Sequence, residues 1–193
     1  MKKIMFNDRY GLTRAVLEGR KTMTRRIIKA PLTMEGKDVY GFTVVSYHNG
    51  EIVEAIEEMA VDEDGAMINN ILPKYKVGEV VAVAQAYKDT FWTSPVLRLR
   101  DKLGWSNKMF VYAGLMPHQI RITNVRIERL QDISDEDCVK EGVWEAQQVN
   151  YTSIDGIPFS PREAFAALID KVSGKGTWNS NPWVFVYEFE LVK

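Results

Sequence analysis

A segment of eight residues near the N-terminus holds a dense group of chemically active side chains. It runs from Gly19 to Arg26 and includes one lysine, two threonines and three arginines: Arg20, Lys21, Thr22, Thr24, Arg25 and Arg26. Cationic and hydroxyl groups at this density suit the binding of an anionic or hydrogen-bonding ligand. A lysine near a threonine also suits proton transfer and nucleophilic attack, because a threonine hydroxyl is a weak nucleophile until a base removes its proton.

The elements around this segment decide whether its side chains can share one site. Apolar residues at helical spacing predict a helix over Asp8–Glu18, and Gly19 stands where that helix would end. The chain from Lys21 to Ile28 is predicted to be extended. Strict alternation along a strand would put Lys21 and Thr24 on opposite faces. A shared site therefore requires the chain to turn or bulge between these two residues.

The rest of the chain predicts short strands and helices without a regular alternation of the two. Strands are indicated at Ile4–Phe6, Val39–Tyr47, Glu79–Tyr87, Gln119–Leu130 and Trp183–Val192. The change of alternation between Ile122 and Val125 predicts a β-bulge. This pattern fits one α+β domain, a small mixed β-barrel with peripheral short helices, better than a doubly wound sheet.

Two helices carry clear start and stop signals, and one further segment is ambiguous. Ser134 is a plausible N-cap for a helix that closes at Glu141-Gly142. Ser160–Glu163 has the form of a capping box, and the helix it begins is predicted to turn Phe165, Leu168, Ile169 and Val172 inward and to stop at Gly174. The acidic stretch Glu51–Asn70 is read as a short helix followed by a loop.

Composition limits the class of protein. A hydrophobic content of 46% and a charged content of 26% are ordinary for a soluble domain. The apolar runs are only strand-length and no signal-peptide pattern is seen, so we expect a cytoplasmic protein without a membrane partner. The single cysteine, Cys138, excludes an internal disulfide and is expected to be a buried thiol. We expect no metal and no cofactor.

Charge is balanced overall but unevenly distributed. The formal net charge of -1 does not indicate a nucleic-acid protein by itself. Basic residues are concentrated between Arg9 and Lys29, where Glu18 is the single acidic residue. The stretch Glu51–Asp64 contains many acidic residues and no basic one. Two interpretations stay open: two solvated faces, or a local basic patch on an otherwise neutral protein.

Three stretches, taken in order, resemble the ASCH family, a branch of the PUA-like β-barrel superfamily. Gly19–Thr24 with Arg26 is similar to the family signature Gly-x-Lys-Thr-x-Thr-x-Arg. Lys76–Val83 is similar to its x-Gly-Asp-x-Val-x-Val strand, and Ile133–Gly142 to its helix ending in Glu-Gly. The closing strand Trp183–Glu190 is also similar. The resemblance depends on all of these stretches occurring in the same order as in the family, because each one alone is weak evidence.

The resemblance implies a single ASCH/PUA-like domain over residues 1–193. Insertions at about residues 34–72 and 89–116 have no counterpart in the shortest family members, and the longer layout is similar to ASCH proteins of phages and prophages. PUA-like barrels commonly bind RNA, and short ASCH proteins include an amidohydrolase that removes the acetyl group from N(4)-acetylcytidine. By motif position, the resemblance implies Lys21 as general base, Thr24 as nucleophile and Glu141 as proton donor. Arg25 departs from the apolar residue of that enzyme.

Two functions therefore stand as hypotheses. The first is an amidohydrolase that acts on an N(4)-acylated cytidine or a related small amide. The second is a non-catalytic module that binds RNA or a modified base in the same cleft. Expected ligand contacts are Arg20, Thr22, Arg25 and Arg26, and the candidates for stacking on a base are Tyr87, Trp92 and Trp183. The expected partner in both cases is a nucleoside or RNA ligand, and the oligomeric state is left open.

Overall fold

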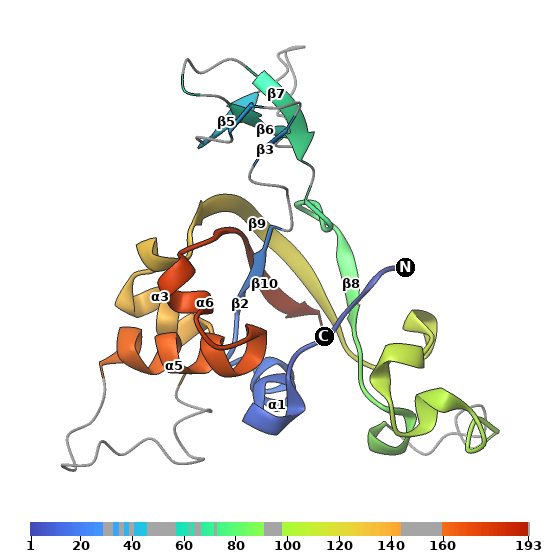
Figure 1. The fold of residues 1–193 in the computed structure, drawn as a ribbon. Coiled ribbons are helices and arrows are strands. Elements are labelled where there is room, and N and C mark those ends of the chain that lie inside the picture. Colours follow the sequence, from blue (N-terminus) through green and yellow to red (C-terminus); the bar gives the residue numbers. More distant parts are fainter. Residues whose placement is uncertain are drawn as a thin grey trace.

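The computed structural model describes residues 1–28, 33–34, 37–38, 41–45, 57–61, 63, 67–71, 73–90, 98–143 and 160–192. Its centre is a five-stranded sheet in the order β1-β8-β9-β10-β2 (Figure 1). The bounds of these strands are β1 Lys3–Ile4, β8 Val80–Val83, β9 Gln119–Arg129, β10 Trp183–Val192 and β2 Met23–Ile27. Only β1 and β8 run parallel, and the other neighbours in this sheet are antiparallel.

The α+β class is confirmed, whereas closure into a barrel is not observed among the described strands. The five strands of the main sheet form an open mixed sheet with β1 and β2 at its edges. The strand predicted over 79–87 is shorter than expected and ends at Val83, and Tyr87 begins a 3-10 turn, η2 (Tyr87–Asp89).

The two longest strands, β9 and β10, form the curved centre of the sheet (Figure 1). Their register shifts between Glu188, which pairs with Asn124, and Phe189, which pairs with Ile122. Thr123 is therefore the extra residue of a β-bulge, and the predicted bulge is confirmed. A bulge bends a strand and strengthens its local twist.

Alternate residues of β10 enter two different hydrophobic clusters, one on each face of the sheet. Phe185, Tyr187 and Phe189 pack in a cluster with residues of β1, β8, β9 and α1 (Leu12–Leu17). Val184 and Val186 pack in a second cluster with residues of α3 (Asp135–Lys140) and α5 (Pro161–Ser173). Because apolar layers cover both faces, β10 reads as an almost continuous apolar run.

The first predicted helix is divided into two elements. A 3-10 turn, η1 (Asp8–Tyr10), is followed by Gly11 in the left-handed region at φ 67° and then by α1. Our prediction of one helix over Asp8–Glu18 is therefore wrong, because glycine readily adopts a left-handed conformation that interrupts a helix. The stop at Gly19 is confirmed, since that residue has φ 72°.

The two helices with strong end signals form as predicted. Ser160 and Glu163 make a capping box at the start of α5, and Gly174 follows its last residue. Ser134 accepts a hydrogen bond from the backbone N–H of Asp137 at the start of α3. The predicted inward face of α5 holds for Phe165, Leu168 and Ile169, but Val172 is 41% exposed. The short helix α6 (Thr177–Ser180) follows α5.

Residues of the predicted first insertion form small sheets separate from the main sheet (Figure 1). β3 (Thr33–Met34) pairs with β4 (Lys37–Asp38), and β5 (Gly41–Val45), β6 (Glu57–Val61) and β7 (Met67–Ile71) form a three-stranded antiparallel sheet. The prediction of a short helix followed by a loop over Glu51–Asn70 is wrong over β6 and β7, and its residues 51–56 lie outside the described residues. Pairing of β6 on both sides overrides the helical preference of its Glu, Met and Ala residues.

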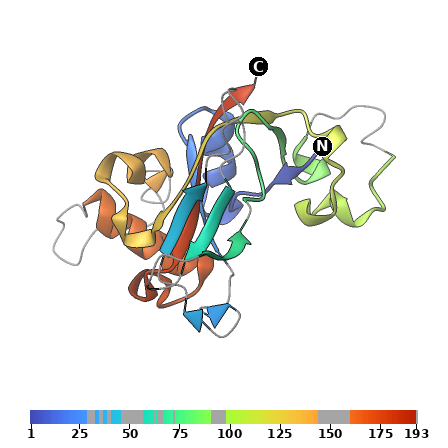
Figure 2. The same ribbon diagram turned by 90° about the horizontal axis from the view of Figure 1, so that it is seen from above.

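The second predicted insertion contains 3-10 turns where it is described. These are η3 (Leu103–Trp105), η4 (Lys108–Phe110) and η5 (Ala113–Leu115), and a further turn, η6 (Leu130–Asp132), follows β9. Both ribbon views place η3, η4 and η5 on the opposite side of the molecule from α3 and α5 (Figure 1 and Figure 2). In the part of the chain that the structure describes, no helix has the length and apolar character needed to cross a membrane.

Candidate functional site

The three side chains expected to do chemistry line one cavity of about 350 Å³. Lys21 lies just before β2, Thr24 belongs to β2, and Glu141 follows the last residue of α3. The other walls are formed by Met5, Phe6, Asn7, Leu12, Arg25, Arg26, Ile27, Phe165, Leu168, Ile169, Val172 and Ser173. Glu141 therefore lines the same cavity as Lys21 and Thr24, although it is 120 residues away from Lys21.

Lys21 and Thr24 share the cavity because Lys21 lies outside the strand. After Gly19, the backbone N–H groups of Arg20 and Lys21 both donate to the carbonyl of Ala15, at 2.8 and 3.0 Å. The strand begins only at Met23. Alternation along a strand therefore does not constrain Lys21, and both it and Thr24 reach the same cavity.

Lys21 and Glu141 form a buried ion pair at the base of the site. The Nζ atom of Lys21 donates to Oε2 of Glu141 at 2.7 Å and to the Glu141 carbonyl at 2.6 Å. Lys21 is 2% exposed and Glu141 is 5% exposed, and Thr24, which lines the same cavity, is also 5% exposed. The Phe6 ring lies 5.8 Å from Nζ. The lysine is thus removed from water and held by one carboxylate.

Burial lowers the pKa of Lys21 below its ordinary value, because it disfavours the charged ammonium. The Glu141 carboxylate opposes this effect through its charge and its hydrogen bond, and the nearby cations Arg26 and Arg25 lower the pKa further. The net effect is a lowered pKa of Lys21, which a lysine needs if it is to act as a base.

Gly142 allows Lys21 to lie close to the end of α3. Its φ of +82° is in the left-handed region, and a β-carbon there would lie 3.4 Å from both Cβ of Lys21 and Cδ2 of Leu12. The sequence indicated Gly142 only as the end of the helix. Its second role, as the surface against which the Lys21 stem packs, depends on a tertiary contact that no local signal reveals.

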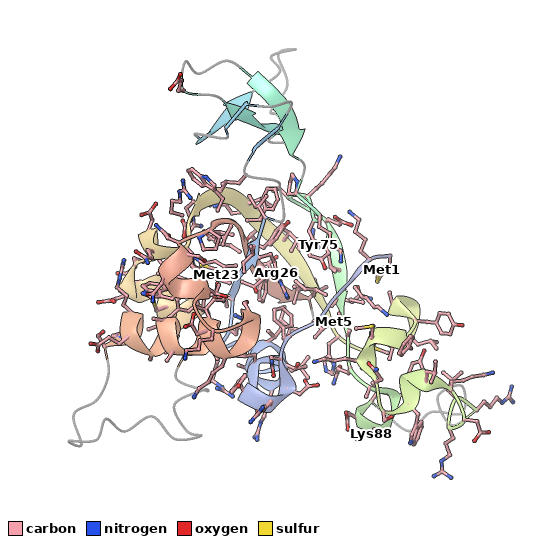
Figure 3. All side chains as sticks on the ribbon, in the orientation of Figure 1. Met1, Met5, Met23, Arg26, Tyr75 and Lys88 are labelled. Atoms are coloured by element: carbon pink, nitrogen blue, oxygen red, sulfur yellow. The ribbon has the colours of Figure 1, made fainter. Side chains whose placement is uncertain are left out.

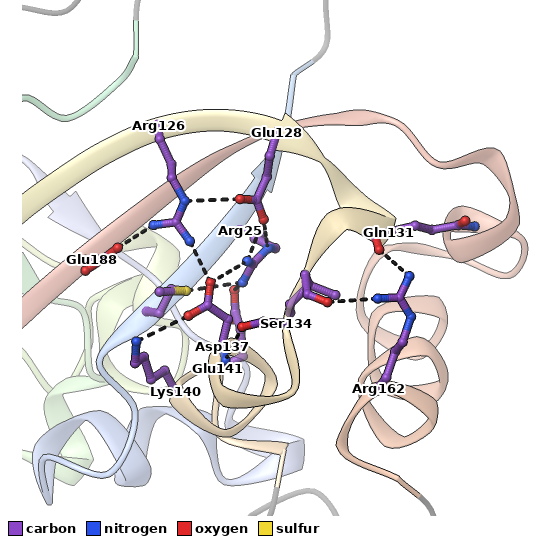
Figure 4. A network of polar contacts seen from close by, with 12 residues as sticks. Arg25, Arg126, Glu128, Gln131, Ser134, Asp137, Lys140, Glu141, Arg162 and Glu188 are labelled. Carbon is purple, nitrogen blue, oxygen red and sulfur yellow. Dashed lines mark hydrogen bonds and ion pairs between the residues drawn. The ribbon is translucent and has the colours of Figure 1, made fainter.

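Arg25 lines the cavity, but its guanidinium is occupied by carboxylates (Figure 4). It donates to Glu128 Oε1 from Nε at 2.9 Å and from Nη2 at 2.5 Å, to Asp137 Oδ2 at 3.1 Å and to Glu141 Oε1 at 3.2 Å. Nη1 also lies 3.2 Å from the Sδ atom of Met23. This arrangement does not favour the predicted role of Arg25 as a ligand contact. To bind an anion, Arg25 would have to break its ion pairs with these carboxylates.

Arg26 is the cation of the segment that remains exposed at the cavity (Figure 3). Its Nη2 atom donates to the Met5 carbonyl at 2.6 Å, and its guanidinium lies 5.8 Å from the centre of the Phe6 ring. Arg20 and Thr22 do not line the cavity. Arg20 pairs with Glu18 at the surface, and the backbone N–H of Thr22 donates to the Lys140 carbonyl at 3.0 Å.

Two of the aromatic residues predicted to stack on a base, Tyr87 and Trp183, do not line the cavity. Tyr87 is 1% exposed in a separate core cluster, and its hydroxyl accepts a hydrogen bond from the N–H of Tyr112 at 2.8 Å. Trp183 is covered by the Arg129 guanidinium, 4.2 Å from its ring centre. Trp92 lies outside the described residues.

Among the described residues, the aromatic side chains that line the cavity are instead Phe6 and Phe165. The sequence showed Phe6 only as part of a strand and Phe165 only as part of an apolar helix face. Apolar walls around a few convergent polar groups are typical of a small-molecule site, and the cavity volume lies within the range of about 300–1,000 Å³ for such sites.

Comparisons of the chain with protein-family models, with curated proteins and with solved structures found no match.

Proposed function

We propose that this chain is an ASCH-type hydrolase that binds a nucleoside in the cavity and cleaves an amide such as that of N(4)-acetylcytidine. In this proposal the five-stranded sheet is the core of a PUA-like barrel. The observation that carries the proposal is the buried pair of Lys21 and Glu141, 2.7 Å apart, in the cavity that Thr24 also lines.

The pair can supply both a base and an acid by moving one proton. Transfer from Nζ of Lys21 to Oε2 of Glu141 leaves a neutral amine and a protonated carboxyl. Burial favours this neutral form, because a low-dielectric environment penalises the two charges. The pair is then ready to take a proton from a nucleophile and to give one to a leaving amine.

The reaction follows in two steps that conserve protons. Lys21 takes the Thr24 hydroxyl proton while Oγ1 attacks the amide carbon, and the resulting tetrahedral centre collapses as Glu141 protonates the departing nitrogen. The products of this step are the free amine and an acyl ester on Thr24. Glu141, now ionised, takes a proton from the water that attacks the ester. Lys21 returns its proton to Oγ1 of Thr24 as the acid leaves, so the threonine hydroxyl, the neutral amine and the protonated carboxyl are all regenerated.

The lining of the cavity supports a small, largely uncharged substrate. Phe6 and Phe165 offer apolar ring surfaces to a base, and Arg26 supplies a cation at the exposed side. Long RNA would need more cations, because each phosphate contact depends on a basic group and the chain has no net positive charge.

The non-catalytic alternative draws less support from the same side chains. Arg25 is engaged by three carboxylates, and the stacking candidates Tyr87 and Trp183 do not line the cavity. A module that only binds a base also has no need for a desolvated lysine and a threonine in one cavity, whereas a hydrolase needs both.

A panel of acylated cytidines tests the proposal. We expect the parent protein to release cytidine from N(4)-acetylcytidine or a related acyl cytidine, as followed by chromatography. Thr24→Ala removes the nucleophile and Glu141→Gln removes the proton donor, so each should lower kcat by about 10²–10⁴-fold. Lys21→Met should be similarly inactive, since it removes the base.

Thr22→Ala is the matched control, because Thr22 is a threonine two residues away that does not line the cavity. It should keep kcat within about threefold of the parent. If the parent protein hydrolyses no acyl cytidine, the proposal is wrong. Equal losses in Thr22→Ala and Thr24→Ala, with both variants folded by circular dichroism, would show that Thr24 has no special role.

A further inference from the structure

We propose that Arg25 is a positioning residue that holds the Glu141 carboxylate and determines which of its oxygens exchanges a proton with Lys21. This inference rests on the proposed hydrolase function and adds a residue to its machinery. It is carried by the buried ion pairs around Glu141, which involve strands β2 and β9 and helix α3 (Figure 4).

The two oxygens of Glu141 have different donors. Oε1 accepts from Nη1 of Arg25 at 3.2 Å, and Oε2 accepts from Nζ of Lys21 at 2.7 Å. A guanidinium has donors but no acceptor and keeps its charge at all ordinary pH values. A proton on Oε1 would therefore face another donor, so the mobile proton belongs on Oε2, next to Lys21.

Arg25 can do this because it is itself held on two other sides. Its side chain is 1% exposed, and Glu128 and Asp137 accept from its Nε and Nη2 atoms. Glu128 belongs to β9, and Asp137 lies one helical turn before Glu141 in α3. A planar fork of donors can serve carboxylates on three sides, which the single ammonium of a lysine cannot do with the same geometry.

A second arginine in the network provides a matched control. Arg126 donates to Glu128 Oε2 at 3.1 Å and to Asp137 Oδ2 at 2.6 Å, so it binds the same two carboxylates as Arg25. It also pairs with Glu188. Among the contacts of the described residues, Arg25 contacts Glu141 and Arg126 does not. Arg126 is also absent from the cavity lining.

The charge of Arg25 and its shape have separable effects. Its charge acts on Lys21, whose pKa is lowered mainly by burial and also by Arg26 and Arg25, against the opposing carboxylate of Glu141. Its shape acts on Glu141 through the hydrogen bond to Oε1. Replacement by lysine keeps the charge and loses the fork, whereas replacement by methionine loses both.

The test compares Arg25→Met, Arg25→Lys and Arg126→Met on an acyl cytidine that the parent hydrolyses. A displaced catalytic group can cost about 100-fold, so we expect kcat of Arg25→Met to fall by about that factor with KM changed by less than about threefold. The rising limb of its pH profile should move to higher pH, because Lys21 loses a neighbouring cation. Arg25→Lys should keep that limb in place and still lose at least about tenfold in kcat.

Arg126→Met should keep kcat within about threefold and leave the pH profile unchanged. Full activity of Arg25→Lys would overturn the inference, because the fork would then be unnecessary. Equal losses in Arg126→Met and Arg25→Met would also overturn it, since the whole network and not the Glu141 contact would then matter. If Arg25→Met does not fold, Arg25→Met with Glu128→Gln removes the excess buried charge and is measured in its place.

A readout without substrate separates this inference from the proposed function. The ¹⁵N signal of the Lys21 Nζ atom reports on its hydrogen bond to Glu141. We expect the chemical shift of that signal to change in both Arg25 variants and to remain at the parent value in Arg126→Met. If the parent hydrolyses no acyl cytidine, the proposed function fails, and an unchanged Lys21 signal in both Arg25 variants would then overturn the inference independently.

Discussion

At the scale of single residues, the site depends on how closely Lys21 approaches the end of α3. The aliphatic part of Lys21 packs against Gly142, whose left-handed backbone follows directly after Glu141. The ion pair of Lys21 and Glu141 therefore forms where the chain has no side chain to keep the two apart. Glycine meets two demands here, a positive φ and a close contact.

Replacing Gly142 by alanine should destabilise the protein and disturb the site. A left-handed alanine costs about 1–2 kcal/mol. Strain at residue 142 cannot relax easily, because the new β-carbon would lie 3.4 Å from Lys21 Cβ and from Leu12 Cδ2. We expect a lower free energy of unfolding in urea and a reduced rate of acyl cytidine hydrolysis.

Gly78→Ala is the matched control for this change. Gly78 has nearly the same φ, +81°, but a β-carbon there would meet nothing within 4 Å. The backbone cost should be similar, and the rate of hydrolysis should stay at the parent level. An equal loss of activity in the two variants would contradict a specific role for the contact between Gly142 and Lys21.

At the scale of elements, the cavity wall formed by α5 is supported by the turn into α6. The Asp170 carboxylate accepts hydrogen bonds from the backbone N–H groups of Gly176 at 3.0 Å and Trp178 at 2.8 Å. The Trp178 ring packs edge-on against Phe165, which lines the cavity, with ring centres 6.2 Å apart. One carboxylate thus joins the end of α5 to the helix that supports its inner face.

Replacing Asp170 by asparagine should lower the thermal midpoint at neutral pH but not in acid. The backbone N–H groups of Trp178 and Gly176 lower the pKa of Asp170 below its ordinary value. Its contribution to stability is therefore fully present above the ordinary Asp value near 3.8 and is lost as the pH falls through the lower folded value. Thermal unfolding of parent and variant from pH 7 down to pH 2 measures this difference.

The exposed Asp132 offers a control on another element. Asp132→Asn should change the midpoint little across the same pH range. A difference between the parent and Asp170→Asn that stays constant down to the lowest pH would contradict the assigned role of the ionised carboxylate.

At the scale of the whole molecule, the main sheet carries the site and the β5-β6-β7 sheet is hydrogen-bonded separately. Both chain segments that flank the extra sheets are tied to β10. Ile28 donates from its backbone N–H to the Trp183 carbonyl at 3.0 Å, and the Lys74 N–H donates to the Tyr187 hydroxyl at 3.0 Å. The main sheet therefore holds the two ends independently of what lies between them.

Replacing residues 30–72 by a flexible linker should leave the main sheet folded. Eight Gly/Ser residues span about 15 Å on average, which suits two ends held on one strand. We expect cooperative thermal unfolding, a circular dichroism spectrum with less strand signal, and retained hydrolysis of acyl cytidines. Loss of cooperative unfolding would show that the extra sheets belong to the same folding unit as the site.

Features that depend on neighbouring residues or on residue type could be predicted from the sequence. The capping box of α5, the N-cap of α3, the bulge near Thr123 and the buried Cys138 thiol all follow from local hydrogen bonds or from side-chain alternation. Burial raises the pKa of that thiol to about 12, as suits an inert structural cysteine. Each helix cap joins residues three positions apart, and the bulge shows in the sequence as a change of side-chain alternation.

Which side chains meet could not be predicted in the same way, because it depends on tertiary packing. Lys21 and Glu141 are 120 residues apart and Arg25 and Glu128 are 103 apart, so their pairing depends on strand register and on how α3 packs. The same long-range packing buries Tyr87 in a core cluster and places Phe6 and Phe165 in the lining of the cavity. Residue types and spacing can nominate a lysine and a threonine, but a partner from another element is chosen by the fold, because side-chain contacts form in space and not along the chain.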